Sequence, residues 1–248
     1  MALSKNNPIF SFMSLKSYKF VLFLFLLLGF ANANSQSYYS GGGLFEGRFG
    51  VTVGTTNYSP GANFLFSKSA PGYKVGFIGT VFISEKFELF VEMNYARHFM
   101  KFVGREYKTS KPEDIKFKLE TFNVPFILDY TVLNLKDEWF FGINAGPSVS
   151  FLYDYSILDD DKKDYVLEPL YSSPRDLEFD SNKEKVSFNA FLAMGVSVEY
   201  NRFMATFRYN KGITDPYRNI NLYSPVMELK GKDNYFEFSL VYLFEDKL

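Results

Sequence analysis

The stretch TFNVPFILDY, from Thr121 to Tyr130, alternates apolar residues with others, and a proline stands in its middle. Alternation with a period of two is typical of a β-strand whose two faces meet different surroundings. Pro125 has no N–H for the hydrogen-bond ladder, and proline in sheets is normally confined to edges and bulges. The pattern predicts a strand with a bulge or a locally broken ladder at Pro125, next to a polar group on the face of Asn123 and Asp129.

Seven further segments share this alternation, and each has one face nearly free of charge. They are residues 45–54, 72–83, 87–98, 139–153, 186–200, 203–210 and 235–244, and the opening stretch belongs to an eighth, residues 117–132. Segments of about ten residues with this pattern are typical of membrane-barrel strands, which are apolar toward lipid and polar toward the lumen. The composition of 30 Phe and 18 Tyr against one Trp also favours strands over helices.

The connections between these segments alternate in length. Three connections span only a few residues, and four are long, residues 55–71, 99–116, 154–185 and 211–234. An even-stranded meander with short turns at one end and long loops at the other is the arrangement of an outer-membrane barrel, with the short turns in the periplasm. The predicted fold is all-β, an eight-stranded antiparallel closed up-and-down transmembrane β-barrel domain formed by residues 45–248.

The first residues predict export from the cytoplasm. The apolar run FVLFLFLLLGF, residues 20–30, follows two lysines and precedes several small residues. This order is that of a secretory signal peptide, and the run is shorter than the roughly 20 residues that a spanning helix needs. We expect a signal peptide at residues 1–35, cleaved after Ala33 or Ser35, and a linker at residues 36–44.

Charge and cysteine content exclude several kinds of site. Loss of the predicted signal peptide removes three of the 27 Lys and Arg residues, which leaves 24 against 28 Asp and Glu residues. A net charge near −4 gives no nucleic-acid footprint, so we expect no nucleic acid as a partner. The absence of cysteine excludes disulfides, thiolate metal sites and a lipid-modified N-terminal cysteine. Since no metal or phosphate-binding motif is present, we predict no cofactor, no metal and no catalytic residue.

Charged residues on the predicted inner faces are the candidate site. Eight strands make a narrow barrel that side chains fill, and charges enclosed in a membrane protein must pair. Counting from the short turns places Glu92 and Arg208 near mid-height, Glu237 somewhat higher, and Arg48 and Asp129 low. We predict that these five residues form a polar network that plugs the lumen, in which Arg208 pairs with Glu92 or Glu237.

His98 is the only histidine and offers an alternative function. The sequence predicts an interfacial polar side chain at the top of a strand, next to Arg97. An imidazole close to Ser110, Ser150 or Ser187 and to an acid would instead activate a nucleophile, as in an outer-membrane lipid-modifying hydrolase or acyltransferase. A narrow-pore transport protein is the second alternative.

The third long connection is acidic and aromatic. Its run DDDKKD, residues 159–164, lacks the glycine and the spaced ligands of a calcium loop. We interpret it as a solvated loop. The alternative is a surface for a partner, or for divalent cations that bridge lipopolysaccharide.

Six segments carry a resemblance to a known family. In order along the chain they are GRFGVTVGTTNY, FELFVEMNYARHF, FNVPFILDY, GINAGPSVSFLY, FNAFLAMGVSVEY and ATFRYNKGITDPYRN. With them, residues 45–244 resemble the PorT-like outer-membrane β-barrel domain family of Bacteroidetes. The resemblance implies a cell-envelope protein of the outer membrane with a structural, surface-binding or envelope-assembly and secretion accessory role. The partners it implies are outer-membrane lipid, lipopolysaccharide and envelope proteins that meet the long loops.

Overall fold

A computed structural model describes residues 47–63, 65–107, 109–168, 188–217 and 230–245, which belong to one compact unit, Gly47–Leu248. The predicted signal peptide, linker and first two strand residues lie outside the described residues. No helix in the described part of the chain is long and apolar enough to cross a membrane.

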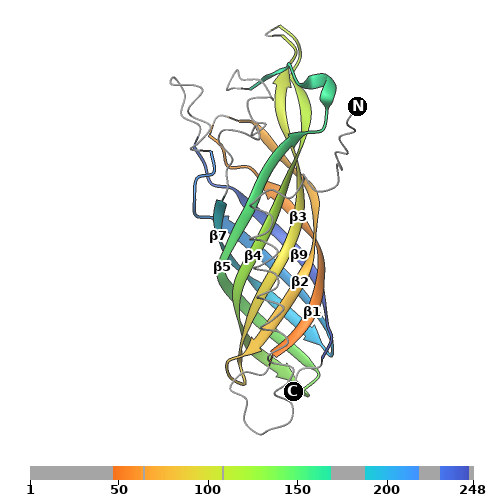
Figure 1. Cartoon of the computed structure of the whole chain (residues 1–248), viewed down its shortest axis with the longest axis vertical. Helices are drawn as coiled ribbons and strands as arrows, with labels where there is room; N and C mark the ends of the chain where they lie inside the picture. The colour runs from red at the N-terminus through yellow and green to blue at the C-terminus, as the bar shows by residue number, and fades with distance from the viewer. Residues whose placement is uncertain (1–46, 64, 108, 169–187, 218–229, 246–248) are drawn as a thin grey trace, which may run out of the picture. The chain divides into compact units, whose positions relative to one another are not determined.

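Eight long strands form a closed antiparallel ring (Figure 1). They are β1 (Gly47–Ser59), β2 (Ser67–Phe82), β3 (Phe87–Arg105), β4 (Glu113–Leu135), β5 (Trp139–Ile157), β7 (Phe188–Tyr200), β8 (Phe203–Gly212) and β9 (Asn234–Leu243). Strands adjacent in this list pair with each other, and β1 also pairs with β9, which closes the ring. The predicted eight-stranded barrel is confirmed.

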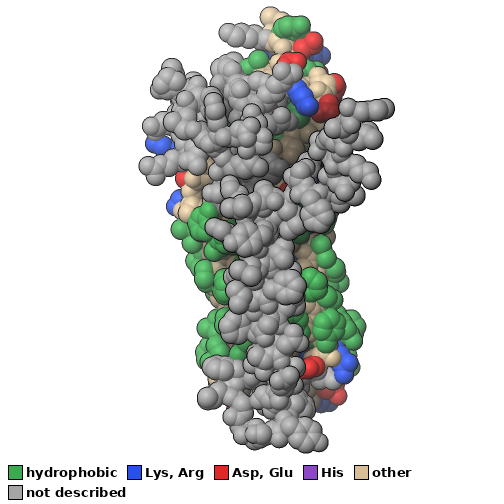
Figure 2. All heavy atoms as spheres, viewed as in Figure 1, with side chains coloured by type: hydrophobic (Ala, Val, Ile, Leu, Met, Phe, Trp, Pro, Cys, Tyr) green, Lys and Arg blue, Asp and Glu red, His purple; other side chains and the backbone are tan. Residues whose placement is uncertain are grey.

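The outer wall of the barrel is apolar and carries two rows of aromatic rings. In the lower row, near the short turns, the ring pairs are Phe87 with Tyr130, Trp139 with Tyr200 and Phe203 with Tyr242. In the upper row they are Tyr73 with Phe99, Phe151 with Phe188 and Tyr209 with Phe236. Trp139 and Phe151 are twelve residues apart on β5, which spans roughly 30 Å along a strand tilted by about 40° and matches a bilayer's hydrocarbon core. Hydrophobic side chains cover much of the visible wall at this height (Figure 2).

Strands β3, β4 and β5 continue beyond the upper aromatic row, at the end away from the short turns (Figure 1). We call this part the extension: residues 100–105, 113–120 and 154–157, with the two-residue strand β6 (Val166–Leu167), which pairs with β3. The prediction of a long loop over residues 99–116 is therefore wrong for most of its length, because the β3–β4 ladder runs on to Gly104 and Glu113. A short 3-10 helix, η2 (Asp160–Lys162), follows β5.

Pro125 interrupts the ladder without shifting it. The β3–β4 register pairs Val91 with Phe126 and next Asn94 with Asn123, so the two intervening pairs are missing while the register stays the same. The prediction of a bulge or a locally broken ladder is confirmed in its second form. The unchanged register places Glu92, a buried lumen residue, opposite the proline. The gap therefore borders the polar interior of the barrel. Polar groups there can satisfy a backbone carbonyl that the proline leaves without a donor, whereas lipid cannot.

Candidate functional site

The middle of the lumen holds four charged side chains from four strands of the ring. Arg208 Nη1 on β8 lies 2.5 Å from Glu92 Oε1 on β3 and 3.5 Å from Glu237 Oε1 on β9. Lys74 Nζ on β2 lies 3.5 Å from Glu92 Oε2 and 3.2 Å from Glu237 Oε2. We call these four residues the central charge cluster. Its two cations and two anions balance, and all four side chains are at most 5% exposed.

Glycines that face the lumen leave room for these long side chains. A Cβ added at Gly195 would lie 2.1 Å from the Phe207 carbonyl oxygen and 2.7 Å from Arg208 Cγ, and one added at Gly76 would meet the Met93 carbonyl oxygen and the amide oxygen of Asn94. Asn94 Nδ2 in turn donates to Glu92 Oε2 at 2.8 Å. The small residues on β2 and β7 therefore set where the central charge cluster fits, since a narrow barrel has no other free volume for them.

Two further polar groups lie nearer the short turns. Arg48 donates to Glu88 Oε1 at 2.8 Å and also pairs with Glu199. Asp129 accepts hydrogen bonds from Asn144 Nδ2 at 3.2 Å and from Ser197 Oγ at 2.5 Å. The contacts of Arg48 with Glu199 and of Asp129 with Ser197 join strands that are not consecutive in the sequence.

The five residues predicted as one polar network are all buried in the lumen. Glu92, Arg208 and Glu237 meet in the central charge cluster, whereas Arg48 and Asp129 each have their own partners. Sequence reasoning missed the bridging role of Lys74. Its inward position follows from the alternation on β2, but the carboxylates it meets belong to strands that only the closed ring brings near.

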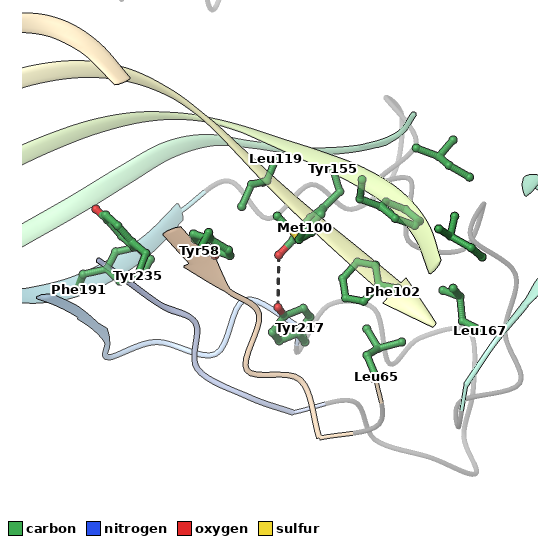
Figure 3. Close-up of a cluster of buried hydrophobic side chains, with 13 residues drawn as sticks. Tyr58, Leu65, Met100, Phe102, Leu119, Tyr155, Leu167, Phe191, Tyr217 and Tyr235 are labelled. Atoms are coloured by element: carbon green, nitrogen blue, oxygen red, sulfur yellow. Dashed lines mark hydrogen bonds between the residues drawn. The ribbon is translucent and has the colours of Figure 1, made fainter. Parts of the chain in front are cut away.

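Apolar side chains also fill the lumen above and below the central charge cluster, beside the polar side chains predicted to plug it. The lower cluster consists of Ile78, Phe90, Ile127, Ala193, Met204, Val241 and Leu243. The upper cluster (Figure 3) consists of Tyr58, Leu65, Met100, Phe102, Ile115, Phe117, Leu119, Tyr155, Ile157, Leu167, Phe191, Tyr217 and Tyr235. The upper cluster continues into the extension, whose inner face is apolar and whose outer face is charged.

Asp233 ties the upper end of the barrel together and was not predicted from the sequence. Its carboxylate is fully buried and accepts hydrogen bonds from Tyr58 Oη at 2.6 Å, Tyr217 Oη at 2.5 Å and the Gly61 backbone N–H at 2.9 Å. The Tyr217 hydroxyl also lies 3.3 Å from that of Tyr155, a contact drawn in Figure 3. The end of β1, the segment after it and the segment after β8 therefore meet at one carboxylate, and β5 reaches it through the Tyr217 hydroxyl.

His98 lies inside the lumen, and the expectation of an interfacial side chain is wrong. Even-numbered residues of β3 point inward, and His98 is 1% exposed. Its Nδ1 lies 2.9 Å from Thr56 Oγ1 and its Nε2 lies 3.3 Å from Thr121 Oγ1, while its ring packs 4.6 Å from that of Tyr58. Its hydrogen-bond partners within the described residues are thus threonines rather than a serine and a carboxylate.

The three serines that sequence analysis considered beside His98 have other surroundings. Ser150 donates to Asn123 at 2.5 Å, and the Ser110 carbonyl accepts from Arg105 at 3.2 Å. Ser187 lies outside the described residues. The described contacts therefore supply no observation for the hydrolase or acyltransferase alternative.

The DDDKKD run forms η2 and the turn after it, and lysines neutralise its surroundings. Lys162 Nζ lies 2.7 Å from Glu113 Oε2, and Lys163 Nζ lies 2.9 Å from Asp160 Oδ1. Within the parts of the chain that the structure describes, no three His, Cys, Asp or Glu side chains gather where they would hold a metal ion.

A closed eight-stranded barrel with an aromatic outer wall and charges enclosed in its lumen belongs to the class of outer-membrane β-barrel proteins. The chain belongs to the family described as outer membrane protein beta-barrel domain, whose model matches residues 30–218. The protein is therefore an outer-membrane protein. A comparison with curated proteins gives no match.

The solved structures that are similar to this chain include Ail and Neisserial surface protein A. The first is Ail, the attachment invasion locus protein of Yersinia pestis, in complex with the heparin analogue sucrose octasulfate, at 11% identity and a TM-score of 0.38, covering 80% of this chain and 99% of Ail. The second is Neisserial surface protein A, at 16% identity and a TM-score of 0.37, covering 79% of this chain and 95% of that protein.

Proposed function

We propose that the protein is a sealed, non-enzymatic barrel that holds its extension on the outer side of the outer membrane as a binding surface. The observation that carries this proposal is the filling of the lumen at three levels: an apolar cluster near the turns, the central charge cluster, and an apolar cluster that reaches into the extension. A wide aqueous path requires a larger ring of strands than eight.

The charge balance of the lumen supports a plug more than an ion path. Arg208 and Lys74 are each within 3.5 Å of both Glu92 and Glu237, so neither sign of charge is in excess at mid-height. A selective pore lines its constriction with charges of one sign. The balanced cluster instead links β2, β3, β8 and β9 across the lumen.

The extension supports a binding role outside the membrane. Its sheet is fixed from within by Phe102, Ile115 and Phe117, which are at most 1% exposed. Near its end, large apolar side chains remain accessible, with Tyr107 66% and Leu158 44% exposed. In this proposal these two side chains supply apolar contacts to the partner.

The partner belongs to the cell envelope in this proposal, and the role is structural or an accessory one in envelope assembly or secretion. The resemblance to the PorT-like family of Bacteroidetes supports this part, together with the predicted signal peptide at residues 1–35 and linker at residues 36–44. In this proposal the barrel domain comprises residues 45–248. Lipopolysaccharide and outer-membrane lipid surround its wall.

Site-specific photo-cross-linking in living cells tests the binding role. A cross-linking amino acid at Leu158 is expected to capture a defined envelope protein, whereas one at Phe77, which faces lipid at 55% exposure, is not. Met100 and Phe117 lie opposite each other, so an Asn-Gly turn in place of residues 101–116 shortens the hairpin in register. This variant should still fold and should lose the adduct at Leu158. Equal capture at Leu158 and Phe77, or an adduct that survives the shortening, would contradict the proposal.

A further inference from the structure

A row of lysines crosses the outer face of the extension. The register places Lys68 of β2 opposite Lys101 of β3, and Lys101 opposite Lys116 of β4. Their side chains are 60%, 39% and 62% exposed. Like charges directly opposite each other on neighbouring strands destabilise a sheet. Three lysines in one row therefore impose a cost that the fold itself does not require.

Internal carboxylates compensate this row only in part. Asp114 forms salt bridges with two of the lysines, with Oδ1 2.7 Å from Lys68 Nζ and Oδ2 3.3 Å from Lys101 Nζ. The hydrogen bond from Lys68 lowers the pKa of Asp114, so this carboxylate stays ionised at neutral pH. Lys116 has its carboxylate partner, Asp159, only at 4.0 Å. The row thus keeps a positive excess that faces away from the lumen.

The position of the row relative to the apolar wall indicates which anion it meets. Directly below it, Arg97 and Lys118 share Glu120, and the Arg97 guanidinium lies 5.8 Å from the ring centre of Tyr73. Tyr73 contacts Phe99 in the upper aromatic row, which marks the edge of the lipid. The lysine row lies just beyond that edge, at the height where lipid head groups of the outer leaflet end.

We propose that Lys68, Lys101 and Lys116 form a binding site for the phosphate groups of an outer-leaflet glycolipid of the lipid A type. The acyl chains of the lipid lie against the apolar wall below, and its phosphates accept hydrogen bonds from the three ammonium groups. This site is on the outside of the sheet and is independent of any protein that binds the exposed end of the extension.

The test is a titration of the purified, detergent-solubilised barrel with diphosphoryl lipid A and with the same lipid after dephosphorylation. The test variant combines Lys68→Gln, Lys101→Gln and Lys116→Gln. A matched control removes three exposed positive charges at the short turns, through Lys86→Gln, Lys136→Gln and Arg202→Gln. Heat-dependent mobility in gels establishes that all three proteins are folded.

Each Lys or Arg near an anionic membrane surface strengthens attraction roughly fivefold, and Asp114 offsets part of this. The test variant should therefore bind diphosphoryl lipid A between about tenfold and a hundredfold more weakly than wild type. The control variant should bind like wild type, and none of the three proteins should differ toward the dephosphorylated lipid. Wild-type affinity in the test variant, an equal loss in the control, or no preference of wild type for the phosphorylated lipid would overturn the proposal.

Discussion

Removing one member of the central charge cluster should destabilise the barrel more than removing an oppositely charged pair. Arg208→Met leaves Lys74 with two carboxylates, Glu92 and Glu237, in a lumen where all are at most 5% exposed. Leaving a buried charge without compensation costs about 3–5 kcal/mol. Adding Glu92→Gln restores neutrality, because Lys74 and Glu237 remain paired at 3.2 Å.

The expected coupling follows from Coulomb's law. Two unit charges about 4 Å apart interact by about 4 kcal/mol at an effective dielectric constant of about 20. The double variant should therefore lose about 2–4 kcal/mol less free energy of unfolding than the two single variants together. A matched cycle on the partly exposed pair Lys162 and Glu113, 2.7 Å apart, should give a coupling below about 1 kcal/mol.

Urea unfolding of the barrel in lipid vesicles measures these free energies. Trp139 is the only tryptophan and lies in the lower aromatic row at 41% exposure, so its fluorescence reports loss of lipid contact. Gel mobility of unheated samples gives an independent folded fraction. Losses from Arg208→Met and Glu92→Gln that add within about 0.5 kcal/mol would refute the reasoning, since independent sites behave in that way.

Two further substitutions test the packing of the lumen and of its upper end. Gly195→Ala places a Cβ 2.1 Å from the Phe207 carbonyl oxygen and 2.7 Å from Arg208 Cγ, and should lower the free energy of unfolding by about 1–3 kcal/mol. At Gly79 the nearest atom would be 3.5 Å away, so Gly79→Ala should change the free energy of unfolding by less than about 0.5 kcal/mol. Equal effects in urea unfolding would contradict this difference. Asp233→Asn weakens the charged hydrogen bond from Tyr58 at 2.6 Å and should lower the free energy of unfolding by about 1.5–3 kcal/mol. Proteolysis of the extension should become faster. An unchanged cleavage rate would argue against a role of the Asp233 carboxylate in holding the upper end of the barrel together.

The barrel was predictable because, within the membrane, every strand turns its apolar residues toward lipid and its polar residues toward the lumen. Residues such as Phe236, Phe238 and Leu240 are exposed, while Glu237 and Ser239 between them are buried, as the alternation predicts. Lipid outside and polar groups inside impose the same rule on every strand. The count of eight strands and the inward position of Arg208 follow from that rule alone.

The extension was not predictable by that rule because its polarity is reversed. On β4, Ile115 and Phe117 point inward and Lys116 points outward, since the strand has left the lipid and water now surrounds it. A search for apolar outer faces reads such a stretch as loop. The reversal itself is visible in the sequence, and it marks the height at which the strand leaves the membrane.

The charged residues that pair with each other across the lumen could not be predicted from the sequence. Arg48 meets Glu199, which is 151 residues away, and Lys74 meets Glu237. Alternation states which face a residue occupies, but the ring closure of β1 on β9 and the stagger of the strands decide which residues share a level. Asp233 lies just before β9, where no alternation applies, and its buried position follows from Tyr58 and Tyr217.

Electrical recording from planar lipid bilayers tests the sealed lumen most directly. Wild-type protein, shown to be folded and inserted by its gel mobility in the same lipid, is predicted to leave the membrane as resistant as lipid alone, because apolar clusters close the lumen on both sides of the central charge cluster. Reproducible unitary conductance steps from the wild-type barrel would contradict this account and would make the protein a narrow pore.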